Sequence, residues 1–146
     1  MSSKVGHTMK RHVHVACGIL EQDGLILTAQ RSMTTNLPLK WEFPGGKIEM
    51  GETPEQCLIR EMKEELDVEI TVDRGLTPTT HAYPDFTVTL YPFTCHLRAG
   101  AITMNEHHAL RWIAPGQMGE LDWAEADLPV LDEYLAGAIS GGGGGG

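Results

Sequence analysis

Three glutamates lie close together in a segment that is unusually rich in acid. Residues 45–70 contain seven Glu and one Asp, with two glycines in front. On a helix with about 100° per residue, Glu61, Glu64 and Glu65 fall within one arc of about 100°. Carboxylates gathered in this way can bind Mg²⁺, which also takes phosphate oxygens from a substrate. The alternative is a solvated acidic face whose charge is partly neutralised by neighbouring basic residues.

The helix that would carry these acids has a well-marked beginning. Thr53 is a good N-cap, Pro54 suits the first helical position, and Gln56 completes a capping box with Thr53. We expect the helix to end near Leu66. Its apolar residues form a stripe beside the acidic arc, so the carboxylates should lie at the edge of the buried face.

The rest of the chain alternates between strand patterns and one further helical pattern. We expect strands at 12–20, 25–29, 41–43, 68–72, 78–83, 86–97 and 110–113, a hairpin turn at 23–24, a loop at 31–40 and a turn at 44–46. A second helix is expected at 127–136, with Gly137 behind it. This mixture predicts an α/β or α+β domain over residues 11–137. Residues 1–10 read as a loose terminus, and the glycine run 141–146 as a flexible artefact outside the fold.

Composition and charge exclude several function classes. The formal net charge of −9 argues against a broad surface for a nucleic acid polymer, although metal ions can bridge an acidic site to one nucleotide. No apolar run approaches the ~20 residues that span a membrane, and the N-terminus carries no apolar signal segment. Cys17, Cys57 and Cys95 show no CxxC spacing or disulfide framework, which favours the reducing cytoplasm.

The fixed residues of segment 46–68 resemble the Nudix box, G-x5-E-x7-R-E-U-x-E-E-x-G-U, in which U is a bulky apolar residue. The matching positions are Gly46, Glu52, Arg60, Glu61, Met62, Glu64, Glu65 and Val68. The one departure is Asp67, which stands where the family has glycine. That position follows the helix and commonly needs a left-handed conformation, which Asp tolerates better than most residues. We therefore expect slight strain at Asp67 and intact metal ligands.

The resemblance extends over residues 12–135 and is similar to MutT-type members of the family. WEFPGGKIEMGETPEQ carries the MutT likeness, whereas NEHHALRW and DWAEADLPVL resemble the CTP pyrophosphohydrolase branch, beside the 8-oxo-dGTP diphosphatases. The resemblance implies the Nudix fold, an α/β/α sandwich with a mixed sheet between helices. It also implies hydrolysis of a nucleoside triphosphate to the monophosphate and pyrophosphate, with Mg²⁺ as cofactor and Mn²⁺ as a substitute, in nucleotide-pool sanitation.

The resemblance also implies roles for individual residues. The expected metal ligands and catalytic acids are Glu61, Glu64, Glu65 and Glu106, with the main-chain oxygen of Gly45 as a further ligand. Glu52 and Arg60 are expected to orient the helix acids. The expected substrate contacts are Arg31, Asn36, Glu42, Phe43, Pro44, Gly46, Lys47 and Asp127. Among these, Arg31 and Lys47 match phosphate-binding positions, and Asp127 matches the residue that reads the base.

The residues alone leave four of these roles open. Glu106 also fits a solvated loop acid, Arg31 and Lys47 fit surface cations, and Asp127 fits the cap of the second helix. An ionised Asp127 only accepts hydrogen bonds, so it would suit a base that offers an amino or N–H group. Cytosine and oxidised purines both offer one. We expect CTP, dCTP or 5-methyl-dCTP to rank above unmodified purines, with 8-oxo-dGTP as a rival.

Two function classes remain in view. One is a Mg²⁺-dependent nucleotide hydrolase, acting on nucleoside triphosphates or on another nucleoside diphosphate derivative such as ADP-ribose or a nucleotide sugar. The other is a non-catalytic Nudix nucleotide-binding sensor. The intact acids Glu61, Glu64 and Glu65 favour catalysis, because a pure binder need not keep all of them. The expected partner is a small nucleotide, with no nucleic acid polymer and no membrane, and the chain is expected to be a monomer or homodimer.

Overall fold

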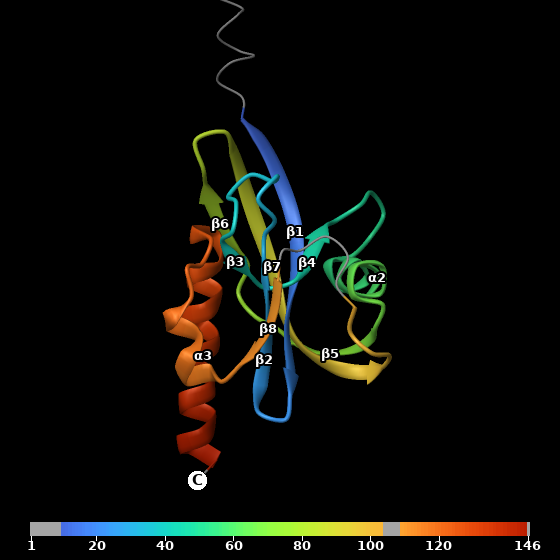
Figure 1. Cartoon of the computed structure of the whole chain (residues 1–146). Coiled ribbons are helices and arrows are strands. Elements are labelled where there is room, and N and C mark those ends of the chain that lie inside the picture. Colours follow the sequence, from blue (N-terminus) through green and yellow to red (C-terminus); the bar gives the residue numbers. More distant parts are fainter. Residues whose placement is uncertain (1–9, 104–108, 146) are drawn as a thin grey trace, which may run out of the picture.

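The computed structural model describes residues 10–103 and 109–145, in which a mixed sheet of eight strands lies between helices (Figure 1). The strands are β1 (Arg11–Gln22), β2 (Leu25–Gln30), β3 (Trp41–Glu42), β4 (Gly45–Lys47), β5 (Glu69–Gly75), β6 (Thr79–Ala82), β7 (Phe86–Ala99) and β8 (Ala109–Ile113). The helices are α2 (Pro54–Leu66) and α3 (Leu128–Gly145), with short 3₁₀ segments η1 (Pro115–Glu120) and η2 (Glu125–Asp127). The main path of the sheet is β3-β2-β1-β7-β5, with β4 paired to β1, β6 to β7 and β8 to β2.

The centre of the sheet is the long pair of β1 and β7. These strands pair in parallel from Arg11 opposite Phe86 to Glu21 opposite His96, whereas β2 and β4 pair with β1 antiparallel. Because side chains alternate along a strand, β1 supplies both faces of the sheet. One set of its residues faces α2 and the other faces α3, so a single strand connects the two layers.

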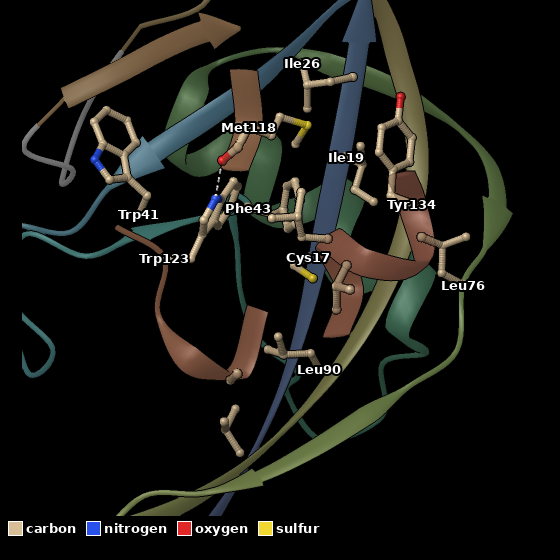
Figure 2. Packing of buried hydrophobic residues seen from close by; sticks show 14 of the residues in the cluster. Cys17, Ile19, Ile26, Trp41, Phe43, Leu76, Leu90, Met118, Trp123 and Tyr134 are labelled. Atoms are coloured by element: carbon tan, nitrogen blue, oxygen red, sulfur yellow. Dashed lines mark hydrogen bonds between the residues drawn. The ribbon is translucent and has the colours of Figure 1, made fainter. Parts of the chain in front are cut away.

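Each face of the sheet carries its own apolar core. On the α2 side, Leu20 of β1 packs with Leu58 and Met62 of the helix, and all three are fully buried. On the α3 side, the buried cluster includes residues of β1, of η1 and of α3, as Figure 2 shows. There the indole N–H of Trp123 donates to the carbonyl of Met118 at 2.7 Å, which ties the segment before η2 to η1. The observed α/β/α arrangement confirms the predicted fold class.

The predicted boundaries of the first helix are confirmed. The Thr53 hydroxyl accepts from the Gln56 amide at 3.1 Å, and the Gln56 side chain accepts from the Thr53 amide at 3.0 Å, which completes the capping box. At the other end, Asp67 has φ 57° and ψ 42°, the left-handed conformation expected at the family's glycine position. Its amide hydrogen-bonds to the carbonyl of Lys63 at 3.1 Å, and its carboxylate pairs with the Lys63 ammonium.

The prediction of a turn at 44–46 is wrong. Gly45–Lys47 forms strand β4, which pairs with β1 so that Val15, Ala16 and Cys17 lie opposite its residues. Two glycines in three residues give no side-chain alternation, so the pattern of the sequence contained no strand signal.

The C-terminal end of the second helix also differs from the prediction. Helix α3 does not end near residue 136 but continues to Gly145, so residues 141–145 belong to the helix. That the glycine run is flexible and an artefact stays a prediction. Gly137 is not among the glycines with positive φ, so it does not form the left-handed cap that the prediction assumed. Glycine disfavours helices by only about 1 kcal/mol per residue relative to alanine and does not forbid them. Of the predicted loose N-terminus, Lys10 donates to the carbonyl of Tyr83 at 2.7 Å, and residues 1–9 lie outside the described residues.

Within residues 10–103 and 109–145, no helix combines the length and apolar character that a membrane crossing requires. The three cysteines are free thiols, and all three are buried.

The capping box provides a test of how α2 is stabilised. We expect Thr53→Ala to lower the free energy of unfolding by about 1 kcal/mol, because the Gln56 amide loses its acceptor at the helix start. Thr53→Ser keeps the hydroxyl and should stay within about 0.5 kcal/mol of the parent chain. Urea denaturation followed by circular dichroism measures both. Equal losses for the two variants would show that the threonine methyl group, and not the cap, matters.

Candidate active site

Strand β4 approaches β1 and α2 more closely than any side chain would permit. A Cβ atom on Gly45 would lie 1.9 Å from the carbonyl oxygen of Ala16. A Cβ atom on Gly46 would lie 2.1 Å from the carboxyl carbon of Glu61. The carboxyl group of Glu61 therefore lies directly against the backbone of β4 at Gly46, whereas Gly45 permits the close approach of β4 to β1.

The guanidinium of Arg60 joins the acidic residues of this region. It donates to Glu52 through Nε at 2.5 Å and through Nη2 at 3.0 Å. Its Nη1 donates to Glu61 and to Glu64, each at 3.0 Å. Its Nη2 also donates to the carbonyl of Lys47 at 3.1 Å. One cation thus connects the loop before α2, the helix acids and β4.

These contacts change the acidity of the groups involved. The hydrogen bond from Arg60 lowers the pKa of Glu52 to about 2. Burial raises the pKa of Glu61, an effect that the hydrogen bond and charge of Arg60 oppose and the nearby Glu65 adds to. A bound cation would favour the ionised form of a carboxylate that is desolvated and has like charges beside it.

Cys57 contributes a further contact between α2 and β4. Its buried thiol lies 3.4 Å from the carbonyl oxygen of Gly46 and 3.3 Å from that of Lys47. Burial raises the pKa of this thiol to about 11, so the sulfur keeps its proton near neutral pH and can donate it to a carbonyl.

A cavity of about 500 Å³ lies beside this acidic end. Gly45, Gly46, Glu61 and Glu65 line one part of it, and Phe43 and Asp127 also line it. An adjoining cavity of about 400 Å³ shares seven lining residues with the first, namely Val15, Arg31, Thr35, Glu42, Lys47, Leu90 and Asp127. The two cavities therefore form one cleft that extends from the acidic residues of α2 past Asp127.

Asp127 lies on η2 and is buried, with 5% of its surface exposed. Its Oδ2 accepts a hydrogen bond from the main-chain amide of Phe43 at 3.0 Å. Burial raises the pKa of this carboxyl well above its usual value, and the charge of Glu42 raises it further. The second oxygen is an acceptor when the group is ionised and a donor when it is protonated, so pH can change the hydrogen bond that Asp127 offers to a ligand.

Two predicted phosphate contacts lie along the same cleft. Arg31 donates to the Asn36 carbonyl at 2.8 Å, to the Asn36 side chain at 2.6 Å and to Glu42 at 2.9 Å. Lys47 lines both cavities, and no ion pair of its ammonium occurs within the described part of the chain. Lys47 is therefore the more available cation, whereas Arg31 is already held by Asn36 and Glu42.

Some predicted site residues lie elsewhere. Pro44 is fully buried and lines neither cavity, and its carbonyl instead accepts from the Gly18 amide at 2.8 Å. Glu64 has a side chain that is 57% exposed, and it does not line the cleft. Glu106 lies outside the described residues. Of the acids predicted on the helix, the structure thus brings Glu61 and Glu65 to the cleft.

Sequence reasoning did not identify the floor of the cleft. Val13 and Val15 of β1 lie opposite Val88 and Leu90 of β7 in the parallel register, and all four line the second cavity. The alternation of β1 indicated which of its residues share a face. The partner strand and its register were not readable from that pattern, because nothing local specifies a parallel neighbour.

The donor set at the acidic end fits a hard divalent cation. The carboxylates of Glu61 and Glu65 and the backbone of Gly45 line the same cavity, and their ligand atoms are all oxygens. Within the described residues, no three Asp, Glu, His or Cys side chains already form a complete metal cluster. Mg²⁺ does not need one, because it typically takes one or two carboxylates and completes its shell with water and substrate phosphate.

Comparisons with known proteins agree with this geometry. A family model described as NUDIX domain matches residues 10–134. The chain is 34% identical over 124 residues to CTP pyrophosphohydrolase from Escherichia coli (strain K12), covering 85% of this chain and 92% of that protein. It is 39% identical over 82 residues to 8-oxo-dGTP diphosphatase from Proteus vulgaris, covering 56% of this chain and 73% of that protein.

A solved structure gives the same result at the level of the fold. The solution structure of DNA mismatch repair protein MutT from methicillin-resistant Staphylococcus aureus 252 superposes with a TM-score of 0.72 at 38% identity, covering 88% of this chain and 98% of that one. The family model, the sequence relatives and the fold agree with the family that the spacing of the acidic residues indicated. The chain belongs to the Nudix hydrolase family.

Proposed function

We propose that this protein hydrolyses nucleoside triphosphates to the monophosphate and pyrophosphate, with Mg²⁺ as the metal. The observation that carries the proposal is the single cleft that joins Glu61 and Glu65 at one end to the buried Asp127 further along. A triphosphate would lie toward the acids and its base toward Asp127. The names of the relatives, a CTP pyrophosphohydrolase and an 8-oxo-dGTP diphosphatase, support the same reaction class.

The residues of the cleft fit the charge of such a substrate. Lys47 would contact the phosphates, and Arg31 would join it where Asn36 and Glu42 orient its guanidinium. Glu61 and Glu65, with the carbonyl of Gly45, would hold the metal, and Arg60 would keep Glu61 in place. When bound, the cation lowers the pKa of the attacking water and neutralises charge on the departing pyrophosphate. Glu64 and Glu106 remain proposed as further acids of this reaction.

The base is proposed to be cytosine or an oxidised purine. When Asp127 is ionised, its second oxygen would accept from an amino or N–H group, while Oδ2 keeps its hydrogen bond from the Phe43 amide. The second cavity is lined largely by aliphatic and aromatic side chains, which suits a planar base. We also propose the cytoplasm as the compartment, because it keeps the three free cysteines reduced.

A panel of nucleotides tests the proposal. Purified protein is incubated with Mg²⁺ and with CTP, dCTP, 5-methyl-dCTP, 8-oxo-dGTP, dGTP, ADP-ribose and a nucleotide sugar, and released pyrophosphate and monophosphates are measured. We expect pyrophosphate from the triphosphates, with a cytosine or oxidised-purine substrate first. Turnover of ADP-ribose alone would contradict the triphosphate proposal, and binding without turnover would indicate a sensor.

The helix acids provide the first variant test. We expect Glu65→Gln to keep the fold and to lower kcat by at least about 100-fold, because the metal loses a charged ligand. Glu55→Gln is the matched control, since Glu55 is an exposed acid on the same helix that does not line the cleft. Steady-state pyrophosphate release measures both. Near-parent turnover in folded Glu65→Gln protein would remove Glu65 from the metal site.

The contact between β4 and α2 provides a second test. Gly46→Ala places a methyl group where the Glu61 carboxyl lies, so the acid must move away from the cleft. We expect kcat to fall by at least about 10-fold, as expected when a catalytic group is displaced by about 1 Å. Gly116→Ala is the control, because a Cβ there meets no atom within 4 Å. Similar kcat values for the two variants would show that Glu61 need not rest on β4.

The base contact provides a third test. We expect Asp127→Ala to raise KM for the preferred triphosphate by about 10- to 150-fold, the value of one charge-assisted hydrogen bond, and much less for a poor substrate. Asp127→Asn retains an oxygen for the Phe43 amide and changes the group offered to the base, so it separates the two contacts. An equal loss for all nucleotides, together with a lower melting temperature, would indicate a structural role for Asp127.

A further inference from the structure

The position of Asp127 depends on how the short segment η2 is fastened to the sheet. Besides the hydrogen bond from Phe43 to Asp127, the neighbouring residue Ala126 makes a second attachment. Its main-chain N–H donates to the hydroxyl oxygen of Tyr83 at 2.8 Å, and this contact is buried. Ala126 is 4% exposed and Tyr83 is 5% exposed. A buried hydrogen bond therefore lies one residue from the carboxyl that is proposed to read the base.

Tyr83 is itself held firmly at the connection between β6 and β7. Its amide donates to the carbonyl of Phe86 at 2.7 Å, and its own carbonyl accepts from the ammonium of Lys10. Its ring stacks on that of Phe86, with the centroids 5.0 Å apart. The tyrosine thus reaches from a fixed hairpin to η2, and its hydroxyl is the group that makes the connection.

We propose that Tyr83 is a positioning residue for base selection, because its hydroxyl holds the main chain of η2 and thereby sets the direction of the Asp127 carboxyl. This inference rests on the proposed function, in which Asp127 contacts the base. The ring of Tyr83 lines the second cavity together with Phe86, Ala126 and Asp127. The ring shapes the wall of the cleft, whereas the hydroxyl acts on the base through η2.

The hydroxyl and the ring can be separated by one substitution. Tyr83→Phe keeps the aromatic wall and removes only the acceptor of the Ala126 N–H. That amide is then buried without its partner, so η2 must shift until the amide finds water or another acceptor. Since Asp127 follows directly in the chain, such a shift moves its carboxyl relative to the base.

The test compares substrate discrimination in two tyrosine variants. Discrimination is the ratio of kcat/KM for the best triphosphate of the panel to that for the poorest one. We expect Tyr83→Phe to lower this ratio by about 5- to 20-fold, which is the effect of losing one well-formed buried hydrogen bond. The matched control is Tyr134→Phe. Tyr134 is equally buried, and its hydroxyl donates to Glu21 at 2.5 Å, away from the cleft. Its variant should keep the ratio within about twofold of the parent chain.

A double variant shows whether Tyr83 acts through Asp127. In the Asp127→Ala background, Tyr83→Phe should leave the discrimination ratio unchanged, because the group that it positions is absent. A full additional loss in that background would overturn the inference, as would an unchanged ratio in the single Tyr83→Phe variant. The inference would also be overturned if Tyr83→Phe lost as much stability as Tyr134→Phe and kept the discrimination ratio of the parent chain.

Measurements on the parent chain distinguish a failure of this inference from a failure of the proposed function. If the parent chain releases no pyrophosphate from any triphosphate, the proposed function fails and the Tyr83 variants have no ratio to change. If the parent hydrolyses and discriminates while Tyr83→Phe behaves like Tyr134→Phe, only the inference fails. Binding of a non-hydrolysable α,β-methylene CTP, measured by calorimetry, gives a readout without turnover, and Tyr83→Phe should weaken it by about the same factor.

Discussion

The rest of the site depends on the hydrogen bonds that the guanidinium of Arg60 donates to the surrounding glutamates. Several carboxylates of like charge must lie near one another on α2 and beside β4, an arrangement that repulsion and desolvation oppose. Arg60 offsets both effects, since it donates to Glu52, Glu61 and Glu64 at once. The pKa of Glu52 falls to about 2 as a result. This ion pair therefore favours the folded chain at every pH above the usual pKa of a glutamate, and its contribution is lost as the pH falls toward 2.

The central strand β1 lies beside both ends of the cleft. Strand β1 pairs with β4 near the acids and with β7 along the floor of the second cavity. The same strand therefore carries the backbone contact that needs Gly45 and the apolar surface formed by Val13 and Val15. Because side-chain direction alternates with every residue, a register shift of one would remove these valines from the cleft.

Much of the acidic end of the cleft could be predicted from the sequence, because its signals are local. Thr53 and Gln56 mark the start of α2 within four residues, and the left-handed Asp67 marks its end. The identity and spacing of the acids then follow from helical geometry. The strand β4 was missed for a physical reason. Its glycines allow the close approach to Ala16 and Glu61, and residues without side chains give no periodic pattern.

The base end could be predicted only in part, because its contacts are long-range. The sequence indicated Asp127 but not its bond to the amide of Phe43, which lies 84 residues earlier in the chain. The hydroxyl of Tyr83 meets Ala126 across 43 residues, and no local pattern relates the two. The course of α3 beyond Gly137 was also not predicted, since glycine is read as a stop although its backbone can adopt helical angles.

The division of the cleft between distant segments has a consequence for how such a protein can diversify. The acidic end lies within residues 45–65, while the end near Asp127 is assembled from η2, the β6–β7 hairpin and the β1–β7 floor. Under the proposed function, substitutions in the second group can change which nucleobase is accepted while Glu61 and Glu65 keep their places on α2. Under the same proposal, a change of substrate can proceed through separate substitutions near Asp127, each of which leaves the proposed metal ligands in place.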